Sequence, residues 1–166
     1  MAGPSPIRHI RARVHTLDMS SSRISSLCLG LNAGCCFAYA VLFGFMQTKL
    51  LTMYGVESDM KSWKKSGAWD VLAQIMRVVG AFEFLMSFLY FHYIGFVDKH
   101  KAGLRVGVMQ YALLASVSAY RVFFEPKLSA TNVRVAMKSL VVQLVFLAVS
   151  VVGMIKAPPP PKRKSA

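Results

Sequence analysis

Glu83 is the side chain of this sequence whose type and position most strongly indicate chemistry, because it is an acid within a long apolar stretch. The stretch runs from Val71 to Phe96, and in a helix that rises about 1.5 Å per residue Glu83 lies about 18 Å from its start. This depth is near the centre of a hydrocarbon core about 30 Å thick, where a charged carboxylate is costly and normally faces protein or water. We therefore expect Glu83 to face protein and to have a polar partner.

The candidate partners of Glu83 come from two other apolar stretches. Gln143 is closest to Glu83 in estimated depth, and Arg121 has a side chain long enough to reach it. We predict a buried polar network of Glu83, Gln143 and Arg121, which either fixes the register of the helices or forms a site for a proton, an ion or a lipid headgroup. Arg77, Arg121 and Lys138 can also extend to the membrane surface and bind anionic lipid headgroups.

The three cysteines give a weaker chemical signal. Cys28 and Cys35 are seven residues apart and share a helix face, but no second pair of Cys or His follows at a zinc-ligand spacing. We expect the cysteines to be small buried apolar side chains, and we predict neither a metal nor a cofactor. The absence of GxGxxG, Walker A, HExxH and GxSxG motifs favours a non-enzymatic protein over an enzyme.

The composition indicates that these residues belong to a membrane protein. Of the 166 residues, 55% are hydrophobic and 16% are charged, and the mean hydropathy is +0.46. Soluble domains have about 45–50% apolar and about 25% charged residues. The net charge of +13 would suggest nucleic-acid binding in a soluble protein, but the basic residues here flank apolar stretches and form no patch with interleaved aromatic residues. We therefore expect no nucleic-acid partner.

Four apolar stretches reach the length of about 20 residues that a membrane-spanning helix needs. They lack the alternating pattern of barrel strands, so each is predicted to be a helix. The prediction is an all-α bundle of four transmembrane helices within residues 24–155, between a basic N-terminal tail (1–23) and a proline-rich basic C-terminal tail (156–166). The predicted spans are residues 24–46, 71–96, 106–124 and 135–155. The connection at 47–70, which holds Trp63 and Trp69, is expected to lie along the membrane surface.

The faces of the first two predicted helices differ in residue size. Small residues repeat at a spacing of four in the first helix, which allows close helix approach: Ser26, Gly30, Gly34 and Ala38. We predict that this stripe packs against another helix, from the same chain, a second copy or another subunit. A second small-residue motif, Gly103 and Gly107, lies at the edge of the third helix and is expected to matter less. In the second helix, the face of Glu83 is predicted to pack, and the opposite face is aromatic: Phe84, Phe88 and Phe91.

The distribution of basic residues predicts an orientation and a location. Lys and Arg are more frequent in the tails and in the second connection than in the other two connections, which places both termini on the cytoplasmic or matrix-like side. Residues 1–26 resemble an amphipathic mitochondrial presequence. The last five residues resemble a Lys-x-Lys-x-x retrieval signal, with Lys162 and Lys164 as its lysines. The endoplasmic reticulum is favoured over the mitochondrial inner membrane.

Two classes of function are compatible with these features. The sequence favours a non-enzymatic accessory or scaffold subunit of a membrane protein complex, which packs through its helices and binds lipid. Its partners would be membrane lipids and other integral membrane proteins. The alternative is a small transporter, or a lipid-binding or lipid-modifying protein, with a polar site around Glu83.

Overall fold

The computed structural model describes residues 6–125 and 130–159, which form helices and no strand. A short 3-10 helix, η1 (Val97–Lys99), precedes the fifth α-helix. The α-helices are α1 (Pro6–Phe45), α2 (Gln47–Tyr54), α3 (Glu57–Ser66), α4 (Ala68–Ile94), α5 (His100–Phe124) and α6 (Ala130–Lys156). Four of them, α1, α4, α5 and α6, contain segments that are long and apolar enough to cross a membrane. The predicted all-α class with four spans is therefore confirmed.

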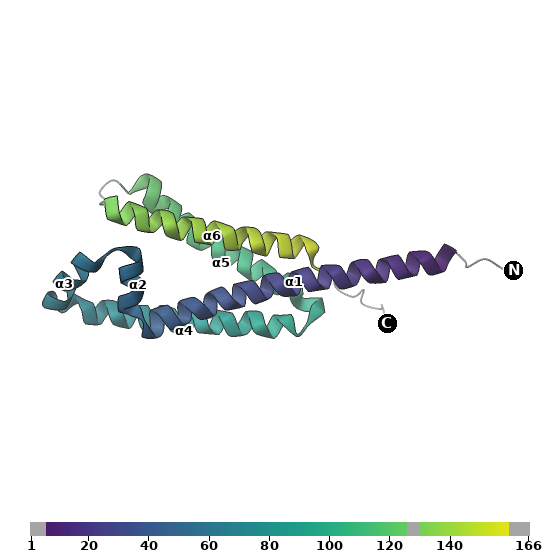
Figure 1. Cartoon of the computed structure of the whole chain (residues 1–166), viewed down its shortest axis with the longest axis horizontal. Coiled ribbons are helices and arrows are strands. Elements are labelled where there is room, and N and C mark those ends of the chain that lie inside the picture. Colours follow the sequence, from purple (N-terminus) through teal and green to yellow (C-terminus); the bar gives the residue numbers. More distant parts are fainter. Residues whose placement is uncertain (1–5, 126–129, 160–166) are drawn as a thin grey trace, which may run out of the picture.

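The four long helices form two antiparallel pairs, α1 with α4 and α5 with α6 (Figure 1). Helix α1 also contacts α5 and α6, so it joins the two pairs. The pairs meet where α6 ends and diverge toward α2 and α3 (Figure 1). We call these the closed end and the open end of the bundle. The N-terminal part of α1 continues past the closed end, so much of the predicted tail is helical backbone continuous with the first span.

The core of the closed end is small and tightly packed. Leu29 and Leu104 are completely buried there, together with Cys28. A Cβ atom added at Gly153 would lie 2.7 Å from Cys28 Cβ, and one at Gly107 would lie 2.7 Å from Ser150 Oγ. These distances leave no room for a larger residue. The expectation that Gly103 and Gly107 matter less is therefore wrong, because Gly107 lies directly against Ser150 of α6 and Asn32 of α1.

The α1–α4 contact follows the packing face predicted for α4. The buried residues of α4 are Ala73, Met76, Gly80, Ser87 and Tyr90. A Cβ atom at Gly80 would lie 2.8 Å from the backbone nitrogen of Gly44, so the two backbones nearly touch. The Ser87 hydroxyl donates to the Ala33 carbonyl oxygen at 2.9 Å. The opposite, aromatic face of α4 is exposed, with Phe88 69% accessible.

The predicted packing stripe of α1 is not the face that the bundle buries. Ser26 and Gly30 are half-buried, whereas Gly34 and Ala38 are exposed, and nothing lies within 4 Å of a Cβ placed at Gly34. The buried face of α1 instead carries Ser25, Leu29, Asn32, Ala33, Cys36 and Ala40. This face is buried because it combines apolar core side chains with polar groups that form hydrogen bonds to other helices. The close approach of α1 and α4 is made possible by Gly80 of α4. The alternative that a helix of the same chain covers the Gly34 face is therefore wrong. Packing of this face against a second copy or another subunit stays a prediction.

The connection at 47–70 folds into the helices α2 and α3 at the open end (Figure 1). Each helix ends at a glycine with a positive φ, Gly55 at 79° and Gly67 at 74°, a conformation that glycine adopts without steric cost. Trp63 and Trp69 are half-buried, and the Lys64 Nζ lies 5.2 Å from the Trp69 ring centroid. The two short helices and the start of α4 therefore form a compact end of the molecule.

Candidate functional site

A crevice of about 170 Å³ lies toward the open end of the bundle and is lined by side chains of α1, α2, α4, α5 and α6. Its position follows from the fold, because the two helix pairs separate there. The polar residues that line it are Tyr39, Tyr54, Glu83, Tyr111, Ser139 and Gln143. The rest of its lining is aliphatic or aromatic. Several polar groups from different helices thus converge on one small space within the membrane-spanning region.

The structure brings together two of the three residues of the predicted network. Glu83 and Gln143 both line the crevice, and both are half-buried. No hydrogen bond joins them among the described residues. The Cys36 thiol of α1 lies near the Glu83 carboxyl group. The Gln143 Oε1 atom is buried and has no hydrogen-bond partner in the described part of the chain.

Arg121, the third member of the predicted network, lies elsewhere. It is exposed, and its Nε is 3.3 Å from Glu125 Oε2, one helical turn further along the chain. The buried face of α5 near this end is formed by Ala115 and Ser118, so Arg121 falls on the outward side of the helix. The structure therefore does not bring Arg121 to Glu83.

A row of polar side chains connects the crevice with the interior of the bundle. The Tyr90 hydroxyl donates to Gln110 Oε1 at 2.7 Å, and Gln110 Nε2 donates to Cys36 Sγ at 3.8 Å. Cys36 Sγ also lies 3.7 Å from the hydroxyl of Tyr111, whose ring stacks on Phe146. Because Tyr111 lines the crevice, this row links the site to α1, α4 and α5. It holds the crevice walls in a defined relative position.

Polar contacts also fasten the closed end of the bundle. His100 is completely buried, with Nδ1 2.8 Å from Ser25 Oγ and Nε2 3.1 Å from the carbonyl oxygen of Ile94. A carbonyl oxygen can only accept, so Nε2 carries the hydrogen of that bond. Asn32 Nδ2 donates to Ser150 Oγ at 2.9 Å. These contacts join α1 to the start of α5 and to α6.

The remaining predicted cations lie at the surface or outside the described residues. Arg77 and Lys138 are both exposed. The Arg77 Nη1 donates to Gln74 Oε1 at 3.4 Å, on its own helix. Lys162 and Lys164, the predicted sorting residues, lie outside the described residues.

Sequence reasoning missed four polar residues of the crevice: Tyr39, Tyr54, Tyr111 and Ser139. Ser139 had a signal, because it lies four residues before Gln143 and therefore on the same helix face. Tyr39 had none, because nothing in the sequence marks Phe43, its neighbour one turn further along α1, as a crevice residue. Tyr54 had none, because its position depends on how the connection folds into α2.

The crevice is rich in groups that can accept a hydrogen bond. The Glu83 carboxyl and the free Gln143 Oε1 can accept, and the tyrosine and serine hydroxyls can donate or accept. No group of three or more His, Cys, Asp or Glu side chains in the described ranges could hold a metal ion. No known protein family, curated protein or solved structure matches this chain. The function must therefore be inferred from the crevice and from the surfaces of the helices.

Proposed function

We propose that this chain is a multi-pass membrane protein that binds a small amphipathic molecule in the crevice, with the polar group of that molecule at Glu83 and Gln143. The observation that supports this proposal is the buried Gln143 Oε1, which has no partner among the described residues and belongs to a residue lining the crevice. A buried acceptor without a hydrogen bond costs about 1–3 kcal/mol. A ligand N–H or O–H group would remove that cost.

The chemistry of the lining narrows the class of ligand. The crevice volume of about 170 Å³ suits a polar headgroup and the adjoining part of an apolar chain. The described lining residues include no cation that would bind a phosphate or a carboxylate, so we expect a hydroxyl or an amine. The aromatic side chains of Tyr39 and Phe43 suit the apolar portion next to it.

The test compares three long-chain probes on the purified full chain: an alcohol, the corresponding amine and the methyl ether of the alcohol. Native mass spectrometry measures how much of each stays bound. We expect the alcohol and the amine to be retained and the ether, which has no donor hydrogen, to be lost. Equal retention of the ether would contradict the proposal.

Variants of the crevice give a second arm of the same test. Glu83→Leu and Gln143→Leu each remove an acceptor and should lower retention of the alcohol about tenfold, as the loss of a hydrogen bond worth about 1.4 kcal/mol predicts. Glu83→Gln keeps an acceptor and should bind nearly normally if Glu83 acts as an acceptor. If the protein is a transporter that depends on the ionisation of Glu83, the Glu83→Gln variant should fold normally and bind the alcohol but lose transport activity. Ser116→Leu, at an exposed position of α5, is the control.

A second candidate function is that of an accessory or scaffold subunit in a membrane protein complex. The uncovered positions Gly34 and Ala38 favour it, because small residues at this spacing allow a helix of another membrane protein to approach closely. The double variant Gly34→Leu with Ala38→Leu should reduce the size of the native particle extracted from membranes. Ala148→Leu, at an exposed small residue of α6, should leave it unchanged. An unchanged particle in both variants would exclude this stripe as an interface.

We also propose that the protein resides in the endoplasmic reticulum, with both termini in the cytosol. The resemblance of the last five residues to a retrieval signal supports this location. Replacing Lys162 and Lys164 by Ser in a chain tagged at its N-terminus should move the protein to later compartments. Mitochondrial localisation of the unaltered chain would overturn the proposal.

A further inference from the structure

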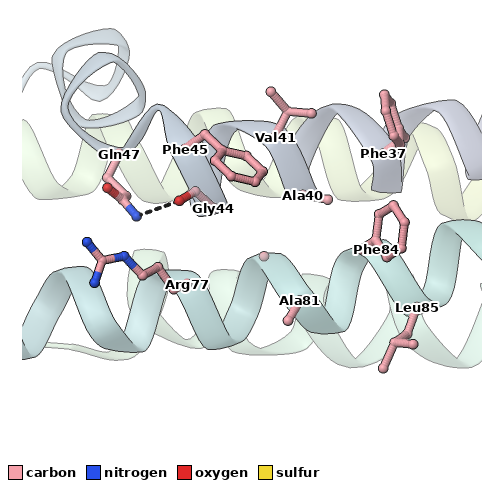
Figure 2. Close-up of a pocket in the computed structure, with 11 residues that line it drawn as sticks. Phe37, Ala40, Val41, Gly44, Phe45, Gln47, Arg77, Ala81, Phe84 and Leu85 are labelled. Carbon is pink, nitrogen blue, oxygen red and sulfur yellow. Dashed lines mark hydrogen bonds between the residues drawn. The ribbon is translucent and has the colours of Figure 1, made fainter.

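A second cavity, separate from the crevice, lies between α1 and α4 (Figure 2). It is an apolar groove of about 920 Å³, and none of its lining residues lines the crevice. Its lining includes Ala40, Gly44 and Gly80, at the point where the two backbones nearly touch, and the larger side chains Phe37 and Phe84. The groove therefore follows the α1–α4 crossing along the surface of the pair.

Polar side chains occur at one end of the groove. Of the described residues that line it, only Arg77 and Gln47 have polar side chains. Gln47 Nε2 already donates to the Gly44 carbonyl oxygen at 2.9 Å (Figure 2). Arg77 forms no ion pair within the described residues, and its hydrogen bond there is the long one to the neutral Gln74 side chain. The groove thus has a positive charge at this end without a compensating carboxylate.

The position of Arg77 along α4 fits the membrane boundary. The 27 residues of α4 extend over about 40 Å, roughly 10 Å more than the hydrocarbon core. The Arg77 backbone lies about 14 Å from the helix start, and its side chain points back toward that start, below Gln47 (Figure 2). The guanidinium therefore reaches toward the headgroup level, while Phe84 lies about two helical turns deeper. The groove runs from the polar boundary into the apolar core.

We propose that this groove binds an anionic phospholipid of the leaflet on the α2–α3 side. Its phosphate binds the Arg77 guanidinium, and one acyl chain lies in the groove toward Phe84. Arginine is suited to this role because its planar group binds a phosphate with two parallel hydrogen bonds. The direction of the groove matches the direction of a lipid in that leaflet. The site goes beyond the crevice, whose described lining residues include no cation for a phosphate.

The exposed Arg121 is a natural comparison for Arg77. Both are arginines with accessible side chains, but Arg121 is paired with Glu125 and lines neither this groove nor the crevice. If charge alone attracted anionic lipid, the two residues would contribute equally. Selective binding at Arg77 is the consequence of the groove.

The experiment places the full chain in nanodiscs that contain equal amounts of phosphatidylglycerol and phosphatidylcholine. Native mass spectrometry after release measures the ratio of the two lipids that remain bound. We expect phosphatidylglycerol to be enriched on the unaltered chain. Arg77→Gln should lower this enrichment about fivefold, equivalent to about 1 kcal/mol for one cation near an anionic surface. Arg121→Gln should leave it unchanged.

Filling the groove tests the place of the acyl chain. Ala81 is exposed and lines the groove, so Ala81→Phe should reduce the amount of bound phosphatidylglycerol, whereas Ala148→Phe on α6 should not. The proposal is overturned if Arg77→Gln keeps the enrichment, if Arg121→Gln loses as much, or if Ala81→Phe binds normally. A further outcome would also overturn it: Ala81→Phe changes the size of the native particle but leaves the lipid ratio unaltered. The groove would then be occupied by a helix of another protein and not by a lipid. Glu83→Leu should leave the ratio unchanged, which separates this site from the crevice.

Discussion

The closed and the open ends of the bundle each contain an amide whose oxygen is buried without a hydrogen bond among the described residues, and the surroundings of the two amides differ. Asn32 at the closed end is completely buried, donates to Ser150, and has no hydrogen bond to its Oδ1 among the described residues. Gln143 at the open end has the same deficiency at Oε1 but lines a crevice. The Asn32 amide joins two helices, and its buried oxygen without a hydrogen bond costs some free energy of folding. The second borders space that a ligand can enter, and this difference separates a structural residue from a candidate binding residue.

The largest expected effect tests how tightly the closed end is packed. Gly107→Leu would place side-chain atoms against Ser150 Oγ and Asn32 Nδ2, which lie 2.7 and 2.9 Å from a Cβ atom at this position. Overpacking of this kind costs about 1–3 kcal/mol, and loss of the Asn32 bond adds to it. We expect a clear fall in the thermal unfolding temperature of the purified chain. The identical change at the uncovered Gly34 should have little effect, and equal losses would show that the closed end is not specially packed.

The next effect separates the two amides directly. Asn32→Leu removes a buried interhelical hydrogen bond and should cost about 1 kcal/mol in thermal unfolding measurements, in the range measured for such bonds in membrane proteins. Gln143→Leu removes an acceptor that has no partner in the described structure and should leave stability unchanged or slightly raised. If Gln143→Leu destabilises the chain as much as Asn32→Leu, Gln143 is part of the structural network and the comparison fails.

The smallest expected effect is that of Tyr111→Phe, in the polar row that also contains Tyr90, Gln110 and Cys36. Tyr90→Phe removes an O–H···O bond of 2.7 Å to Gln110 and should cost about 1 kcal/mol. Tyr111→Phe removes only a long contact of 3.7 Å to Cys36 Sγ and should cost about half as much or less. Thermal unfolding of the two single variants and of the double variant gives both values and their coupling. The reverse order would place the stronger link on the crevice side.

The sequence was sufficient to predict the number of spans, because the length of an apolar stretch decides whether a helix can cross a membrane. The third predicted span begins at Val106, and the helical segment that contains it begins at Val97. The basic residues Lys99, Lys101 and Arg105 interrupt the hydropathy there without interrupting the helical path. A polar residue near a helix end reduces the apolar signal and leaves the backbone unaffected.

The candidate site was only partly predictable, because depth and spacing do not specify which side of a helix faces its neighbours. Depth correctly placed Gln143 with Glu83 at one crevice, but it also suggested Arg121, which α5 turns outward. Spacing favoured the stripe that contains Gly34 over the pair Gly103 and Gly107, and the surroundings of these glycines have the opposite order. Gly34 is uncovered while Gly107 is enclosed, and tertiary packing alone decides between them.

Helix α1 passes through every region of interest as one continuous rod from Pro6 to Phe45. Ser25 and Asn32 lie at the closed end, Tyr39 at the crevice and Ala40 at the groove. A piston-like displacement or a twist of its protruding end would move all of these positions together, because a hydrogen-bonded helix transmits motion along its axis. A displacement of the protruding segment would therefore be transmitted along α1 and would change the shape of both the crevice and the groove.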